Sequence, residues 1–174
     1  MTSSTQYPAG PGWSQLRDPD TDTVLRERLG CHHQTETVAC GEYWDAVVVA
    51  PLERGLAALD VLGVPPEAGY QLLADYARQE LVVLVPVGSA GPLAAVSGVR
   101  VLSRGAWLVV PALRLKSHYV ATWLSSRGED GPLLDPVVLA DGLRLADAER
   151  AGLGRDALNR AVGRPSNMPV AAAS

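Results

Sequence analysis

Short apolar runs bounded by proline and glycine constrain the fold of this chain more than any other feature. The run 46–49 (AVVV) is continuous rather than alternating, which is typical of a strand buried on both faces. Pro51 follows, and leucines at positions 52, 56, 59 and 62 have helical spacing before Gly63. A buried strand followed at once by an amphipathic helix predicts the first half of an α/β unit.

Further strands are predicted at residues 71–76, 81–85, 99–102, 106–110 and 119–124. The connection 77–79 is short enough to join the first two of these strands as a hairpin. Gly105 lies in the connection 103–105 and predicts a second hairpin from the next two, because glycine accepts the positive φ of a tight turn. Residues 30–41 are polar and predict a loop, or a hairpin around 34–37.

Helices are expected on both sides of this strand-rich segment, over residues 20–29, from Asp135 to about Ala148, and over residues 153–162. Residues 1–12 are expected to form a flexible tail, 13–152 the domain, and 153–174 a C-terminal extension whose last part is disordered. The order of elements predicts a single α+β domain. Its sheet would be mixed or antiparallel around a β-α-β-hairpin core, with helices mainly on one face.

Composition narrows the class of function. The net charge of -4 and the pI near 5.3 leave no broad basic field for non-specific nucleic-acid binding. No apolar run approaches the ~20 residues that a membrane span needs. Residues 1–13 lack the basic and apolar regions of a signal peptide. We therefore expect a cytoplasmic protein that does not act at a membrane.

One compact group of soft metal ligands occurs in the sequence, formed by Cys31, His32, His33 and Cys40. Structural zinc takes four ligands, mostly Cys and His. Cys31, His33 and Cys40 could supply three of them, with a distant fourth at His118. Because the spacing matches no Cys-x-x-Cys finger, a loop with a half-buried cysteine at each end is favoured, and no cofactor is predicted. A nucleophilic cysteine is weaker still, because no orienting carboxylate is evident.

Acid–base chemistry has four candidate residues. Asp75 and Glu80 lie across the first predicted hairpin, and Asp45 could meet Asp75 from an adjacent strand. His118 could join them if the strand ends converge near one sheet edge. Carboxylates at strand ends are more often simply solvated, so we prefer the interpretation that these residues are solvent-exposed charges without a catalytic role.

Cations alternate with aromatic residues toward the end of the strand-rich segment. The candidate ligand-binding residues are Arg100, Arg104, Arg114 and Lys116, with Trp107 and Tyr119. Cations interleaved with aromatics bind nucleotides or single strands through phosphate pairing and stacking. Since aromatic side chains in strands usually pack in the core, core packing is the favoured alternative.

The middle of the chain resembles the prim-pol domain of the archaeo-eukaryotic primase superfamily, found in bifunctional DNA primase/polymerase proteins. Residues 98–124 (GVRVLSRGAWLVVPALRLKSHYVATWL) are similar to its segment of two strands around a glycine turn, an exit into proline and a closing aromatic strand. Residues 44–62 resemble the region of its acidic motif, and residues 77–86 its histidine-bearing strand. The resemblance covers about half of the chain and implies a primase- or RRM-like α+β fold. A composition rich in Val, Leu, Ala, Gly and Arg, without Phe, fits the GC-rich bacterial, actinobacterial-type genomes in which the family occurs.

The metal ligands of that family are missing here. An Asp-x-Asp pair on one strand face holds metals against nucleotide phosphates, but the corresponding run here is Val47-Val48-Val49-Ala50-Pro51. Glu80 stands in place of the family's histidine, and Arg100 in place of the acid of its fourth motif.

The resemblance therefore implies a catalytically inactive primase-like domain that acts as an interaction or regulatory module. Its expected partner is another protein, with a nucleotide or single-stranded nucleic acid as the alternative, and a homodimer is a default expectation. The alternative function is a small cytoplasmic enzyme on a reused scaffold, with Asp45, Asp75, Glu80 and His118 as its acid–base residues.

Overall fold

The structure is a computed structural model that describes residues 35–111, 117–118, 121–124 and 131–162. The predicted tail 1–12 and the predicted helix 20–29 lie outside these residues. No helix in the described ranges is both long enough and apolar enough to cross a membrane. The strands are β1 (Thr35–Ala39), β2 (Asp45–Val49), β3 (Leu72–Asp75), β4 (Glu80–Val85), β5 (Val99–Leu102), β6 (Trp107–Pro111), β7 (Ser117–His118) and β8 (Ala121–Trp123). The helices are α2 (Leu52–Val61), α3 (Pro136–Val162) and the short 3-10 turns η2 (Pro66–Ala68) and η3 (Gly91–Leu93).

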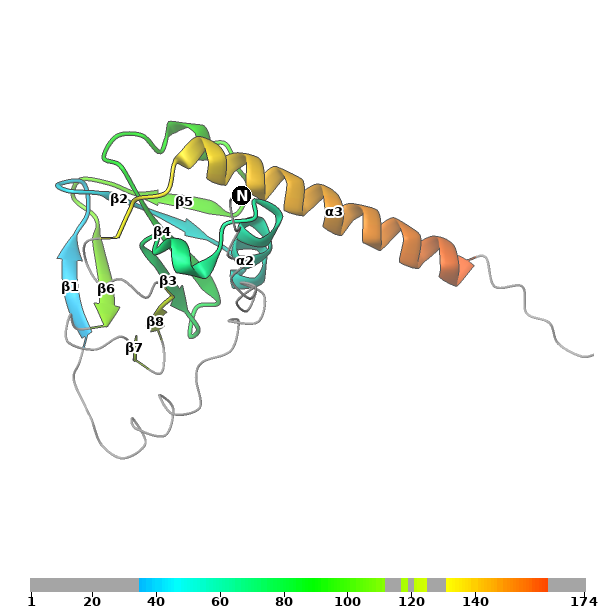
Figure 1. Cartoon of the computed structure of the whole chain (residues 1–174), viewed down its shortest axis with the longest axis horizontal. Coiled ribbons are helices and arrows are strands. Elements are labelled where there is room, and N and C mark those ends of the chain that lie inside the picture. The colour runs from blue at the N-terminus through cyan, green and yellow to red at the C-terminus, as the bar shows by residue number, and fades with distance from the viewer. Residues whose placement is uncertain (1–34, 112–116, 119–120, 125–130, 163–174) are drawn as a thin grey trace, which may run out of the picture.

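A six-stranded sheet in the order β5-β2-β4-β3-β8-β7 forms the centre of the molecule (Figure 1). Each neighbouring pair in it is antiparallel, so β2 and β3 run in the same direction on either side of β4. A second sheet of two strands contains β1 and β6. The predicted α+β class with a single domain is confirmed, while the primase- or RRM-like β-α-β core stays a prediction.

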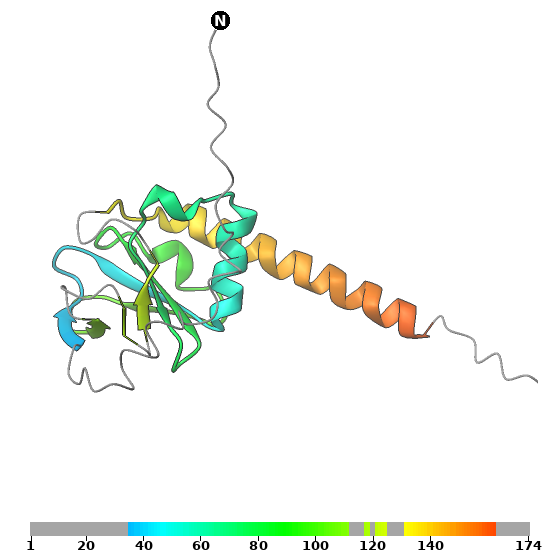
Figure 2. The same cartoon turned by 60° about the horizontal axis from the view of Figure 1, so that its bottom comes forward.

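The two helices α2 and α3 cover one face of the central sheet. Alternate residues of β2 and β4 form the apolar surface beneath them, together with leucines from both helices: Val47, Val49, Leu52, Leu56, Leu59, Leu81, Val83, Leu139 and Leu143. The predicted strand 46–49 and the predicted helix after Pro51 are confirmed. Beyond this contact α3 continues away from the sheet, as Figures 1 and 2 show.

The β1–β6 ribbon, defined as the paired strands Thr35–Ala39 and Trp107–Pro111, covers the opposite face. A second apolar cluster lies between the ribbon and the sheet, formed by Cys40, Ala46, Val48, Leu73, Val82, Leu84, Leu108, Val110 and Ala121. Successive residues of a strand point to opposite sides, so the continuous run of β2 supplies both clusters. Burial on both faces is the physical reason for a run without alternation.

The predicted hairpin between residues 99–102 and 106–110 is wrong. β5 pairs with β2, and β6 pairs with β1, so residues 103–106 form a corner at which the chain passes from one sheet to the other. Residues 40–44 make the matching passage from β1 to β2 and are the longer of the two connections. Pairing each strand with a distant partner lets the ribbon fold over the sheet and bury its second face. The hairpin of β3 and β4 is confirmed.

The C-terminal helix is longer than the sequence predicts. Its start is confirmed, since the Val137 N–H donates to Asp135 Oδ1 at 2.8 Å and Pro136 is the first helical residue. However, α3 runs through Gly152 to Val162 as one helix of 27 residues, where two were predicted. A glycine costs a helix about 1 kcal/mol, which weakens it without ending it. The predicted strand 119–124 contains β8, and its first two residues lie outside the described residues. The described part of the predicted loop 30–41 contains β1.

Candidate functional site

An ion pair between Glu80 and Arg100 crosses the central sheet. Arg100 Nη2 donates to Glu80 Oε1 at 2.7 Å. Glu80 begins β4 and Arg100 lies in β5, and β2 runs between these two strands. Arg100 is opposite Val48, which is opposite Val82, so strand alternation puts Glu80, Arg100 and Val48 on the same face. The ion pair therefore spans the end of β2 on the ribbon side of the sheet.

The ion pair neutralises the charge of Glu80 but adds little to the stability of the fold. Arg100 is exposed, and Glu80 is only partly buried. Ion pairs with an exposed partner stabilise a fold by at most about 1 kcal/mol. The guanidinium nonetheless compensates the Glu80 carboxylate at hydrogen-bond distance, so this acid has no free charge to offer a cation.

Three of the predicted acid–base residues share one row of the sheet. Asp75 is directly opposite Glu80, and it is also opposite Ala121, which is opposite His118. Like charges in direct cross-strand positions destabilise a sheet. Arg78 offsets this repulsion, since its backbone N–H and its Nη1 each donate to Asp75 at 2.9 Å. The side-chain hydrogen bond to Asp75 raises the pKa of Arg78 above its ordinary value.

Asp45, the fourth predicted acid–base residue, lies far from that row. It is opposite Val85 at the other end of β4, roughly 17 Å from the Glu80 position at 3.4 Å per residue. β4 separates its strand from that of Asp75, although the sequence suggested adjacent strands. Asp45 is 1% exposed, and its Oδ2 accepts the Gly88 N–H at 2.8 Å. Its Oδ1 is buried and has no hydrogen-bond partner in the described part of the chain.

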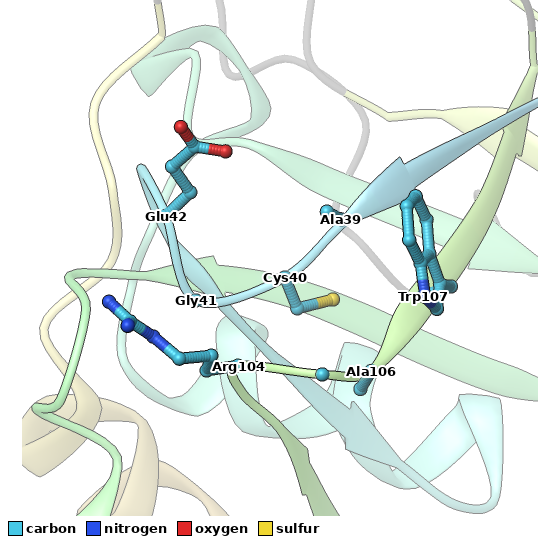
Figure 3. Close-up of a pocket in the computed structure, with 8 residues that line it drawn as sticks. Ala39, Cys40, Gly41, Glu42, Arg104, Ala106 and Trp107 are labelled. Carbon is cyan, nitrogen blue, oxygen red and sulfur yellow. The ribbon is translucent and has the colours of Figure 1, made fainter.

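The corner between the two sheets contains a hollow of about 370 Å³ (Figure 3). It is lined by Ala39, Cys40, Gly41, Glu42, Arg104, Gly105, Ala106 and Trp107. The two passages of chain approach closely here, because a Cβ on Gly41 would lie 2.2 Å from the Arg104 backbone nitrogen. Gly41 also has a φ of +82°, so only glycine suits this position. The Cys40 N–H donates to the Ala106 carbonyl at 3.0 Å and closes the corner.

The hollow brings two of the predicted ligand-binding residues together. Trp107 is 64% exposed rather than packed in the core, and Figure 3 shows Cys40 between Arg104 and Trp107. Arg100 lies near the start of β5, away from the hollow, and its guanidinium forms an ion pair with Glu80. The remaining candidates, Arg114, Lys116 and Tyr119, lie outside the described residues.

Cys40 is the metal candidate that the structure describes. It is buried in the second apolar cluster, and burial, followed by the charge of Asp45, raises the pKa of its thiol. A protonated, buried thiol is a poor nucleophile and a poor metal ligand. Within the described ranges no group of three or more His, Cys, Asp and Glu residues is arranged to hold a metal. Cys31 and His33 lie outside those ranges, so the zinc site stays a prediction.

The hollow itself was not predicted from the sequence. Its only local signals are glycines at 41 and 105, each next to a strand, and such glycines occur in ordinary turns as well. Comparison of the chain with protein-family models, with curated proteins and with solved structures finds no match.

Proposed function

We propose that this chain is a catalytically inactive primase/polymerase-like domain that acts as a protein-interaction or regulatory module. The Glu80–Arg100 ion pair is the observation that carries the proposal. The resemblance assigns a histidine to the position of Glu80 and an acid to that of Arg100. These two positions are far apart in the sequence, yet their side chains meet at 2.7 Å over the run that matches the acidic motif.

The residues at this place do not fit a divalent metal. A polymerase of this kind needs carboxylates that hold cations against the nucleotide phosphates. Val48 offers no ligand atom, the Glu80 carboxylate is compensated by a guanidinium, and Arg100 repels a cation. The same scaffold without these ligands is expected to bind a partner rather than to join nucleotides.

A protein partner is favoured over a nucleic acid by the charges. The chain has a net charge of -4. Four arginines of the described ranges are already engaged by carboxylates: Arg54 by Asp147, Arg78 by Asp75, Arg100 by Glu80 and Arg144 by Asp141. Phosphate backbones are bound chiefly by free cations, so these four arginines are poorly suited to bind them.

A primer-extension assay with Mg²⁺ or Mn²⁺ and all four deoxynucleotides tests the proposal. We expect no incorporation above a protein-free blank, and no thermal stabilisation by the metals with a nucleotide. Incorporation that Glu80→Gln removes would overturn the proposal. The control is Arg144→Gln, which breaks an exposed ion pair within α3 and leaves the sheet unchanged.

The alternative is an enzyme whose acid–base residues are Asp75, Glu80 and His118. It is favoured by their common row across the sheet. It ranks second because Arg78 and Arg100 already bind both carboxylates. Metal-independent ester or phosphoester hydrolysis that both Asp75→Asn and Glu80→Gln abolish would place it first. Hydrolysis that survives both substitutions would exclude these residues.

A further inference from the structure

The outer edge of β1 has backbone groups that no described residue pairs with. The Cys40 N–H bonds toward β6, so by the alternation of an antiparallel ladder Val38 and Glu36 do so too. The amides and carbonyls of Thr35, Thr37 and Ala39 then point away from β6. Nothing among the described residues pairs with them, since β6 is the only strand beside β1 there. Such an edge is a template for another strand.

The face of the ribbon that points to solvent carries two large exposed apolar side chains. Trp107 is opposite Ala39, and Val109 is opposite Thr37, so these side chains form two neighbouring cross-strand pairs. Trp107 is 64% exposed and Val109 is 52% exposed, while the intervening Leu108 is buried against the sheet. Contiguous apolar surface of this kind marks interaction sites.

The β1 edge carries few of the features that protect edge strands from pairing. Natural edges are protected by charged side chains, above all lysine, by proline or by a bulge within the strand, and Thr35–Ala39 contains neither lysine nor proline and one charged residue, Glu36. Its register with β6 is continuous over all five residues, so no bulge interrupts it. Two strands alone are marginally stable, and a third strand would add main-chain hydrogen bonds.

A positive charge lies at the end of the β1 edge that is next to the hollow. Arg104 lines the hollow next to Ala39, and it forms no ion pair with a carboxylate in the described part of the chain, unlike Arg54, Arg78, Arg100 and Arg144. A free guanidinium favours a carboxylate, which it can bind with two parallel hydrogen bonds. Glu42 lies on the rim of the same hollow but, among the described residues, forms no ion pair with Arg104, so the Arg104 guanidinium stays available to a partner's carboxylate.

We propose that β1 is the docking edge for an extended peptide segment of a partner protein, which adds to the β1–β6 ribbon as a third strand. Alternate apolar side chains of the segment lie against Trp107 and Val109, and one carboxylate at the corner end binds Arg104. Main-chain bonds provide the affinity and the alternate side chains the specificity, as in other cases of strand addition. This inference rests on the proposed function as an interaction module and names its surface.

Amide hydrogen exchange of the full chain, measured by NMR, tests whether the edge is open. We expect fast exchange at Thr37 and Ala39, and slow exchange at Val38 and Cys40, whose amides bond to β6. Protection of Thr37 and Ala39 at every protein concentration would mean that another segment of this chain covers the edge. Protection that grows with concentration would mean that a second copy does. Either result overturns the proposal.

Selection of a phage-displayed library of random short peptides on the full chain tests what binds. We expect enriched peptides with alternating apolar residues and an acidic residue at one end. A synthetic copy should bind Trp107→Ala and Arg104→Glu at least roughly tenfold more weakly than the unaltered chain. The side chains of Trp107 and Arg104 are exposed, so folding is retained in both variants. Thr37→Pro is a further variant, which removes one backbone amide from the β1 edge. The control is Leu145→Ala, which alters an exposed leucine on α3.

The two proposals fail separately. The absence of enriched peptides, or equal binding by Trp107→Ala, Arg104→Glu and the unaltered chain, would overturn the docking edge while leaving the lack of catalysis in place. Nucleotide incorporation would overturn the proposed function and would not alter peptide binding at β1.

Discussion

The two faces of the central sheet differ in how they are closed. Two helices seal one face with leucines, whereas a two-stranded ribbon covers the other and exposes Trp107 on its outer side. Both coverings use the same strand, since Val47 and Val49 face the helices and Val48 faces the ribbon. The comparison indicates that the helix face supplies stability, whereas the ribbon face carries the ion pair, the hollow and the β1 edge on which the proposed recognition depends.

A bidentate ion pair locks the helix face. Arg54 of α2 donates from Nε and Nη2 to the two carboxylate oxygens of Asp147 in α3, each at 2.7 Å, and from Nη1 to the Ser97 carbonyl at 2.6 Å. The hydrogen bond from Arg54 lowers the pKa of Asp147. Helix α2, helix α3 and the loop before β5 are therefore held by one side chain.

The largest expected effect on stability is at Leu143. This leucine of α3 is fully buried on the side that faces the sheet, so Leu143→Ala should lower the free energy of unfolding by about 2–5 kcal/mol. Leu145→Ala makes the same chemical change on the same helix at a side that is 51% exposed, and should alter it by less than about 0.5 kcal/mol. Urea denaturation measures both. Equal losses would contradict the orientation of α3.

The next effect is at Asp147. Asp147→Asn should cost about 1 kcal/mol at neutral pH, because it removes charged hydrogen bonds to the mostly buried Arg54 while solvent screens the exposed carboxylate. Since the pKa of Asp147 is lowered in the folded state, its stabilisation is present above the unfolded value near 3.9 and is lost as the pH falls through the folded value. The stability difference between the variant and the unaltered chain should therefore shrink in acid. Asp141→Asn, in an exposed pair on the same helix, is the control and should change the free energy of unfolding at neutral pH by less than about 0.5 kcal/mol.

A smaller effect is expected on the ribbon face at the Glu80–Arg100 pair. A double-mutant cycle with Glu80→Gln and Arg100→Gln should give a coupling free energy of about 0.2–1 kcal/mol that decreases in high salt. Thermal and urea unfolding of the four proteins provide the measurement. A coupling of zero would contradict an energetically effective Glu80–Arg100 pair, and would remove the main support for the proposed function.

The smallest effect on stability is expected for a substitution on the outer side of the ribbon, in contrast to one on its inner side. Trp107→Ala should change the free energy of unfolding by less than about 0.5 kcal/mol, because the indole is mostly exposed. Leu108→Ala, one residue along β6 and facing inward, should cost about 2 kcal/mol or more. If Trp107→Ala proves the more costly, the outer face of the ribbon is covered in solution and is not a docking surface.

Local sequence determined the elements that depend on neighbouring residues. Strand β2 followed from an uninterrupted apolar run, α2 from leucines at helical spacing, and the start of α3 from Asp135 and Pro136. The β3–β4 hairpin followed from its short connection. Each of these signals acts within one turn or one hairpin, so no distant contact is needed to interpret it.

Only the tertiary structure decided the partners of β1, β2, β5 and β6. A strand can satisfy its backbone hydrogen bonds against a sequence neighbour or a distant strand, and the glycine at 105 suits a hairpin and a corner alike. The distant pairing prevails because it folds the ribbon over the sheet and buries the second apolar cluster. The hollow at Arg104 and Trp107, the meeting of Glu80 with Arg100 and the separation of Asp45 from Asp75 all follow from that choice, which no local pattern in the sequence contains.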